Sequence, residues 1–129
     1  MKLKNDFAKR IYEAIKDLPI IDYHCHLNPK EIYEDVPFES LAKMWLGADH
    51  YKWRLMRAAG VEEELITGNA AYCEKFKAFV GVVSSAFGNP LKTWAQMELK
   101  QFFGIDLPLA EENADEILKR DEAEAELYE

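Results

Sequence analysis

The spacing of apolar residues predicts a mostly helical protein. Between Asn5 and Pro19 apolar side chains recur every three or four residues, Asn5 can cap the first turn, and Pro19 cannot continue a helix. The later sequence repeats one arrangement, in which a capping residue or proline precedes a helical apolar pattern that ends at glycine. This arrangement predicts helices over 37–47, 49–60, 69–88 and 89–104, one or two turns over 61–68, and a last helix from 109 that frays beyond Leu118.

One segment breaks the helical pattern. The stretch "IIDYHCH", residues 20–26, is too short for a helix before the turn signal "LNP", and its β-branched and aromatic residues favour a strand. Side chains on a strand alternate between two faces, so Asp22, His24 and His26 would share one face and Cys25 would point away from them. The predicted fold class is therefore mainly α with one N-terminal β-strand.

The two histidines of this predicted strand are candidate metal ligands. On a strand the Cα atoms of His24 and His26 would lie about 6.6 Å apart, which lets both rings approach one cation. Neutral imidazole binds Zn, Fe, Ni or Cu, and a carboxylate or water would complete the coordination. The spacing also fits a hydrogen-bonded buried pair or a solvent-facing strand edge, and these alternatives remain open at this point.

Composition and charge narrow the function classes. The chain has 129 residues, 49% of them hydrophobic, which suits one globular domain. Most of its net charge of −8 lies in residues 111–129, which carry nine acidic and two basic residues, whereas residues 1–110 carry 15 and 14. The sequence has no stripe of basic residues, so neither nucleic acid nor an anionic membrane is expected as a partner. With no apolar leader and two well-separated cysteines, the expected location is cytoplasmic and the thiols are expected to be free.

Several long strings resemble one enzyme family. The string "LPIIDYHCHLNPKEI" resembles the first barrel strand of the amidohydrolase superfamily. The strings "WLGADHYKWRLMRAAGVEEELITG" and "GNPLKTWAQMELKQFFGI" resemble the uronate isomerase (glucuronate isomerase) branch of that superfamily. The resemblance runs from about Asp6 to about Leu118, and only the last residues, "RDEAEAELYE", depart from it.

The resemblance implies a fold and a domain division. The family fold is a (β/α)₈ barrel with a helical domain inserted after the first strand. Residues 1–28 would form the leading helix and first barrel strand, residues 29–118 the helical domain, and residues 119–129 an acidic, fraying tail. Most of the barrel would be absent from this chain.

The resemblance also implies site residues. His24 and His26 would be metal ligands for a divalent ion, with Zn expected, and an aspartate from the last barrel strand would complete the site. That aspartate has no counterpart here. His50 and Tyr51 of "DHYKWR" would contact the uronate in the barrel mouth. The residues alone also allow a simpler arrangement, in which Asp49 caps a helix, Tyr51 packs and His50 faces solvent.

The implied reaction is an aldose-ketose isomerisation of D-glucuronate to D-fructuronate, or of D-galacturonate to D-tagaturonate, in hexuronate catabolism. We expect an N-terminal portion of such an enzyme, inactive alone, with a uronate sugar as partner in the complete enzyme. The unpaired strand could also drive self-association. Two alternatives remain: a stand-alone helical binding or assembly module, and a fragment of a hydrolytic amidohydrolase.

Overall fold

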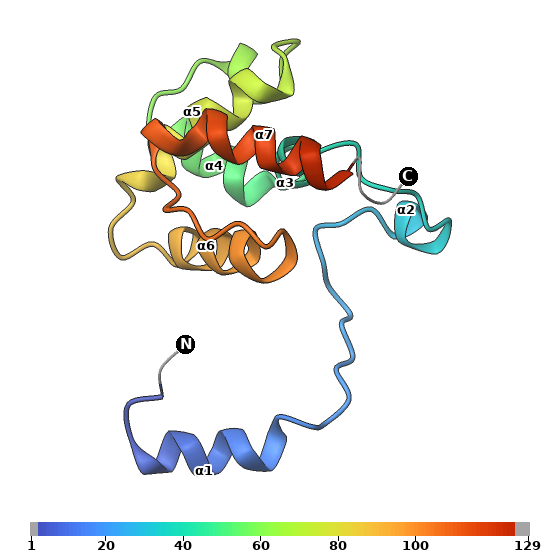
Figure 1. Cartoon of the computed structure of the whole chain (residues 1–129), viewed down its shortest axis with the longest axis vertical. Helices are drawn as coiled ribbons and strands as arrows, with labels where there is room; N and C mark the ends of the chain where they lie inside the picture. Colours follow the sequence, from blue (N-terminus) through green and yellow to red (C-terminus); the bar gives the residue numbers. More distant parts are fainter. Residues whose placement is uncertain (1–2, 126–129) are drawn as a thin grey trace.

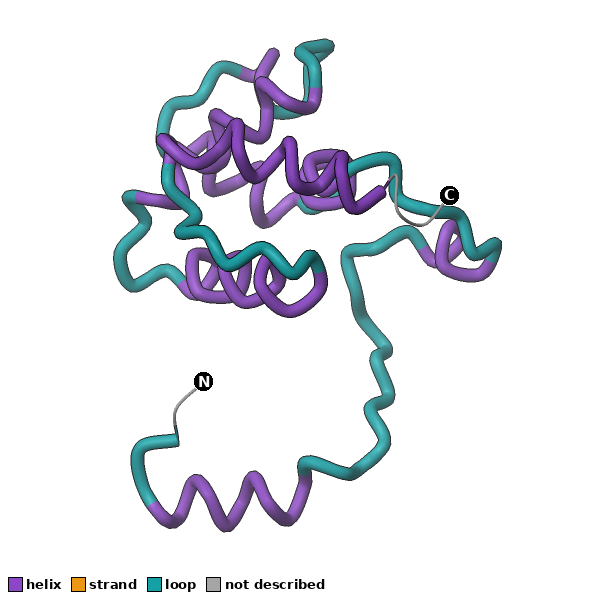
Figure 2. The backbone as a smooth tube through the Cα atoms, in the orientation of Figure 1, coloured by secondary structure: helices purple, strands orange, loops and turns teal. Residues whose placement is uncertain are grey.

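The computed structural model describes the backbone of residues 3–125 and the side chains of residues 3–121, and it consists of helices and loops throughout this part of the chain (Figures 1 and 2). The helices in chain order are α1 (Asp6–Ile15), α2 (Pro29–Tyr33), α3 (Leu41–Leu46), α4 (His50–Ala58), the 3₁₀ turn η1 (Glu63–Leu65), α5 (Tyr72–Ser84), α6 (Pro90–Phe102), η2 (Glu111–Asn113) and α7 (Ala114–Ala125). Helices α3 to α7 gather into one helical body, and α1 lies apart from it at the end of a long loop (Figure 1).

Helix α5 forms the centre of the helical body. The side chain of Glu74 accepts a hydrogen bond from the backbone N–H of Ala71, which closes the first turn. The predicted apolar face is confirmed, because Phe76, Phe79, Val80 and Val83 are completely buried. They pack in one core with residues from the surrounding helices: Leu41, Ala42, Trp45, Leu46, Met56, Ile66, Ala95, Leu99, Ile105, Leu109, Ala114 and Ile117.

The predicted helix ends are confirmed for α4 and α6. The side chain of Asn89 accepts a hydrogen bond from the backbone N–H of Leu91, with Pro90 at the first helical position. Gly60, with φ of 81°, and Gly104, with φ of 61°, follow these two helices in left-handed conformations that favour glycine.

Two details between residues 28 and 41 differ from the prediction. We expected Pro37 to open a helix, but α3 begins after Ser40, whose hydroxyl accepts a hydrogen bond from the N–H of Lys43. The segment "LNP", which we interpreted as a turn, instead starts the short helix α2, with Asn28 as its cap. In both cases a side-chain acceptor followed by free backbone N–H groups decided where the helix starts.

The predicted β-strand over residues 20–26 is wrong. This segment belongs to the loop of residues 16–28 that joins α1 to α2, called here the linking loop, and no described residue pairs with it as a strand (Figure 2). A strand needs a neighbouring backbone to accept and donate its hydrogen bonds. Here the N–H of His24 instead binds the side chain of Asp22 at 3.1 Å. The apolar residues of the segment are exposed, with Ile20 93% and Tyr23 95% accessible.

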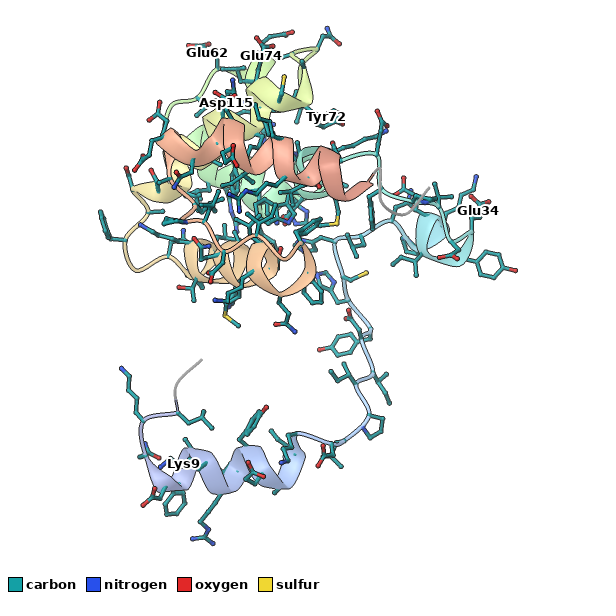
Figure 3. The ribbon with its side chains drawn as sticks, viewed as in Figure 1. Lys9, Glu34, Glu62, Tyr72, Glu74 and Asp115 are labelled. Atoms are coloured by element: carbon teal, nitrogen blue, oxygen red, sulfur yellow. The ribbon has the colours of Figure 1, made fainter. Side chains whose placement is uncertain are left out.

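Helix α1 has an apolar face that contacts no core. Its spacing is amphipathic as predicted, yet none of its residues is buried, and Phe7, Ile11 and Ile15 are all more than half exposed. Figure 3 shows side chains crowded between the helices of the body, whereas those of α1, where Lys9 is labelled, extend into open space. The predicted acidic tail from residue 119 begins inside α7, and residues 126–129 lie outside the described part of the chain.

Candidate functional site

Four side chains from two separate segments meet beside the helical body. His24 and His26 come from the linking loop, and His50 and Tyr51 are the first two residues of α4. The ring of His26 lies at the centre, with its centroid 5.3 Å from that of His24 and 4.8 Å from those of both His50 and Tyr51. The rings of His26 and Tyr51 stack with an interplanar angle of 17°. The structure thus brings together all four side chains that the sequence singled out.

Asp49 joins the two segments. Its side chain caps α4 by accepting hydrogen bonds from the backbone N–H groups of Tyr51 at 2.9 Å and Lys52 at 3.3 Å. The same oxygen, Oδ1, lies 3.1 Å from Nδ1 of His26, and the other oxygen accepts a hydrogen bond from Nζ of Lys52 at 2.7 Å. The position of His26 is therefore tied to the first turn of α4.

The surroundings of Asp49 favour its charged form. Burial of the carboxylate acts to raise the pKa of Asp49, but the hydrogen bond and positive charge of Lys52, together with hydrogen bonds from His26 and the Tyr51 N–H, hold this pKa below its ordinary value of 3.8. Asp49 is consequently ionised at neutral pH. It occupies the positive end of the α4 dipole, which leaves that end less available to a substrate anion.

A cavity of about 680 Å³ opens next to this cluster. Its walls include His26, Asp49, Tyr51, Arg54, Trp94 and Glu98. The guanidinium carbon of Arg54 lies 4.8 Å from the centre of the Tyr51 ring, and Arg54 forms no ion pair with any described residue. The cavity has the size of a small-molecule site and combines aromatic surface with a cation that has no carboxylate partner among residues 3–121.

The donor chemistry of the histidine pair suits part of a metal site. Two imidazoles of an HxH segment lie close together, and a carboxylate next to the Nδ1 atom of one of them is a common support for a metal-binding histidine. Within residues 3–121, however, no group of three histidine, cysteine, aspartate or glutamate side chains is arranged to hold a metal ion. The described residues therefore provide two ligands at most, and the roles of His24 and His26 as ligands stay predictions.

Sequence reasoning missed the central position of Asp49 and its contact with Lys52. Asp49 was recognised as a helix cap, but its contact with His26 spans 23 residues and has no local signal. Aromatic residues at helical spacing usually belong to the core, yet Trp94 is 56% exposed and lines the cavity. Trp45 is buried in the core, and both cysteines are free, as expected, and exposed. No helix of the described chain has the length and apolar character needed to cross a membrane.

Curated proteins similar to this chain are uronate isomerases. The protein from Streptococcus uberis is 58% identical over 118 residues, which cover 92% of this chain and 25% of that protein. The protein from Caldicellulosiruptor saccharolyticus is 56% identical over 113 residues, or 87% of this chain and 24% of that protein. The chain thus spans about a quarter of the length of the curated relatives it matches, as expected for an N-terminal portion of such an enzyme.

A solved structure and a family model agree with these relatives. The crystal structure of uronate isomerase from Thermotoga maritima superposes with a TM-score of 0.83 at 38% identity, covering 95% of this chain and 27% of that one. The family model described as glucuronate isomerase matches residues 1–127. A family match over nearly the whole chain, with this structural likeness, shows that the chain belongs to the glucuronate isomerase (uronate isomerase) family.

Proposed function

We propose that this chain supplies one part of a uronate isomerase active site, and that the complete enzyme interconverts D-glucuronate and D-fructuronate, and D-galacturonate and D-tagaturonate. The observation that carries the proposal is the meeting of His24, His26, His50 and Tyr51 around Asp49. Titratable rings and a phenol next to a cavity of small-molecule size are the groups that such a reaction needs.

The reaction moves one proton between neighbouring carbons. In the open-chain sugar, the C2–H bond breaks, C1 gains a proton, and a hydroxyl proton moves from the C2 oxygen to the C1 oxygen. His50 is suited to move these protons, because imidazole titrates near neutral pH. Tyr51 can both donate and accept a hydrogen bond at a substrate oxygen. Its ring is held by stacking on His26 and His50, which keeps the hydroxyl in one place.

The sugar carboxylate needs a positive partner. Asp49 already caps the start of α4, and the ammonium group of Lys52 is bound to Asp49. Arg54 lines the same cavity without an ion pair among the described residues and lies over Tyr51. Arg54 is therefore the group that we propose to bind the uronate carboxylate.

A divalent metal, with Zn as the expected ion, fits the chemistry of His24 and His26. When bound it would supply an electrophile for the oxygens on C1 and C2. Because the described residues offer no third protein ligand, the coordination would be completed by a group from another part of the complete enzyme or by water. The cytoplasmic location stays a prediction.

The proposed function can be tested with a chimeric enzyme. This chain replaces the matching segment of the Streptococcus uberis uronate isomerase, and conversion of D-glucuronate to D-fructuronate is followed with added divalent metal. Activity within about tenfold of the unaltered relative supports the proposal. A chimera that folds, as judged by its helical spectrum and melting transition, but converts no uronate contradicts it. His26→Ala in the same chimera is the negative control.

A further inference from the structure

Lys52 is a buried lysine whose place in α4 is not explained by helix capping. Its side chain is only 9% exposed, and Nζ lies 2.7 Å from Oδ2 of Asp49 and 5.7 Å from the centre of the Trp45 ring. Burying an ammonium group lowers the stability of the fold unless its contacts offset the loss of hydration. The other N-cap side chains of the described helices accept their backbone hydrogen bonds without a buried cation beside them: Asn5, Asn28, Ser40 and Asn89.

The contacts of Asp49 decide the direction of its hydrogen bond with His26. Oδ1 accepts from the N–H groups of Tyr51 and Lys52, and Oδ2 accepts from the Lys52 ammonium. A carboxylate surrounded by donors in this way is an acceptor only. The remaining contact, between Oδ1 and Nδ1 of His26 at 3.1 Å, therefore requires the proton to be on Nδ1.

The imidazole of His26 has a second constraint on its orientation. Its ring stacks on Tyr51, which fixes the plane of the ring, and a flip within that plane would break the contact between Nδ1 and Asp49. A ring fixed by stacking, with its Nδ1 hydrogen bond held, presents Nε2 in one direction with a free electron pair. This is the arrangement by which a supporting carboxylate sets the tautomer of a functional histidine.

We propose that Lys52 is a positioning residue, which fixes the carboxylate of Asp49 and through it holds His26 in the tautomer with Nδ1 protonated and Nε2 unprotonated. The Lys52–Asp49–His26 chain thus joins the core of the helical body to the linking loop. Only the use of the Nε2 electron pair, as a metal ligand or a proton acceptor, rests on the proposed function. The tautomer itself is a property of this chain.

The test measures the tautomer directly. The full 129-residue chain is labelled with ¹⁵N-histidine, and long-range proton–nitrogen spectra are recorded without metal or sugar, well above the ordinary imidazole pKa of about 6.5. The His26 signals are those lost in His26→Gln. We expect protonated Nδ1 in the wild type. In Lys52→Met the Nδ1-protonated fraction should fall to about half or less, and Lys52→Arg should restore it.

Lys77→Met is the matched control, because Lys77 also pairs with an aspartate, Asp115, but on the exposed surface of α5. It should leave the His26 tautomer unchanged. A wild-type His26 protonated on Nε2 overturns the proposal, as does a folded Lys52→Met chain with the wild-type tautomer. If Lys52→Met does not fold, Asp49→Ser replaces it, since serine can cap a helix but is too short to reach His26. Retention of the wild-type tautomer in that variant also overturns the proposal. None of these results depends on isomerase activity.

Discussion

Asp49 makes the folded chain sensitive to acid. Its folded-state pKa is depressed below 3.8 by Lys52 and the other donors, against the effect of burial. A carboxyl group with a depressed pKa stabilises the fold above its unfolded pKa, and this stabilisation is lost as pH falls through the folded pKa. Because the hydrogen bond to His26 is part of the same network, acid is expected to loosen the linking loop as well.

The first prediction concerns this acid dependence. In Asp49→Asn, the free energy of unfolding should be lower at neutral pH and should fall less steeply than in the wild type as pH drops below about 4. Urea unfolding at a series of pH values measures both. Asp115→Asn is the control, because its partner Lys77 lies in an exposed pair that contributes little. Equal acid slopes for Asp49→Asn and the wild type would show that the Asp49 network does not couple to folding.

The second prediction concerns the hydroxyl group of Tyr51. In the chimera, Tyr51→Phe removes the hydroxyl but keeps the ring that stacks on His26, so kcat/KM for D-glucuronate should fall by about 100-fold with little change in stability. Tyr33→Phe is matched in chemistry, but Tyr33 is 90% exposed on α2, outside the cluster, and should have almost no effect. Steady-state kinetics on both variants measure these effects. Equally small losses of kcat/KM in the two variants would show that the Tyr51 hydroxyl takes no part in the reaction.

At the scale of elements, α5 holds the helical body together. Phe79 is completely buried and packs edge-on against Trp45, with ring centroids 6.0 Å apart. Phe79→Ala should therefore lower the free energy of unfolding by about 3–5 kcal/mol. Phe87→Ala, at a residue that is 87% exposed, should change it by less than about 0.5 kcal/mol. Urea titrations provide both values, and a small loss for Phe79→Ala would mean that the core does not depend on α5.

The helices were predictable where local chemistry decides them. The cap at Asn89 and the stops at Gly60 and Gly104 are local signals, and the apolar face of α5 follows directly from residue spacing. The loop conformation of residues 20–26 was not predictable in this way. Their β-branched and aromatic residues show that the segment can pair as a strand, but not whether a partner strand is present. Residues 20–26 have no such partner among the described residues and form a loop.

The site was predictable only in part. The "HCH" and "DHY" strings identified His24, His26, His50 and Tyr51, whose meeting in space is a finding of the structure, whereas their roles stay predictions. The partly buried chain of contacts from Lys52 through Asp49 to His26 had no sequence signal. It depends on where the linking loop places His26 relative to the first turn of α4, and no local sequence pattern predicts that position.

For the whole molecule, the arrangement leaves a large apolar surface uncovered. Phe7, Ile11 and Ile15 of α1 and Ile20 and Ile21 of the linking loop are more than half exposed, as is Tyr23. Exposed apolar surface of this extent favours association. We therefore predict that the isolated chain self-associates as its concentration rises, as measured by sedimentation equilibrium. Ile21→Lys should shift the equilibrium towards monomer, and Phe87→Lys on the helical body should not. A wild-type chain that stays monomeric at all concentrations contradicts this prediction.

The described part of the chain provides a partial site: two imidazoles without a third protein ligand among these residues, and a cluster of rings beside an open cavity. The most direct test is to measure the initial rate of D-glucuronate conversion by this chain, with divalent metal, before and after adding the remaining three quarters of the Streptococcus uberis uronate isomerase as a separate polypeptide. The account predicts no conversion by the chain alone and metal-dependent conversion by the mixture, lost with His26→Ala. Conversion by the chain alone, or an inactive mixture in which the two polypeptides form a stable complex, would contradict it.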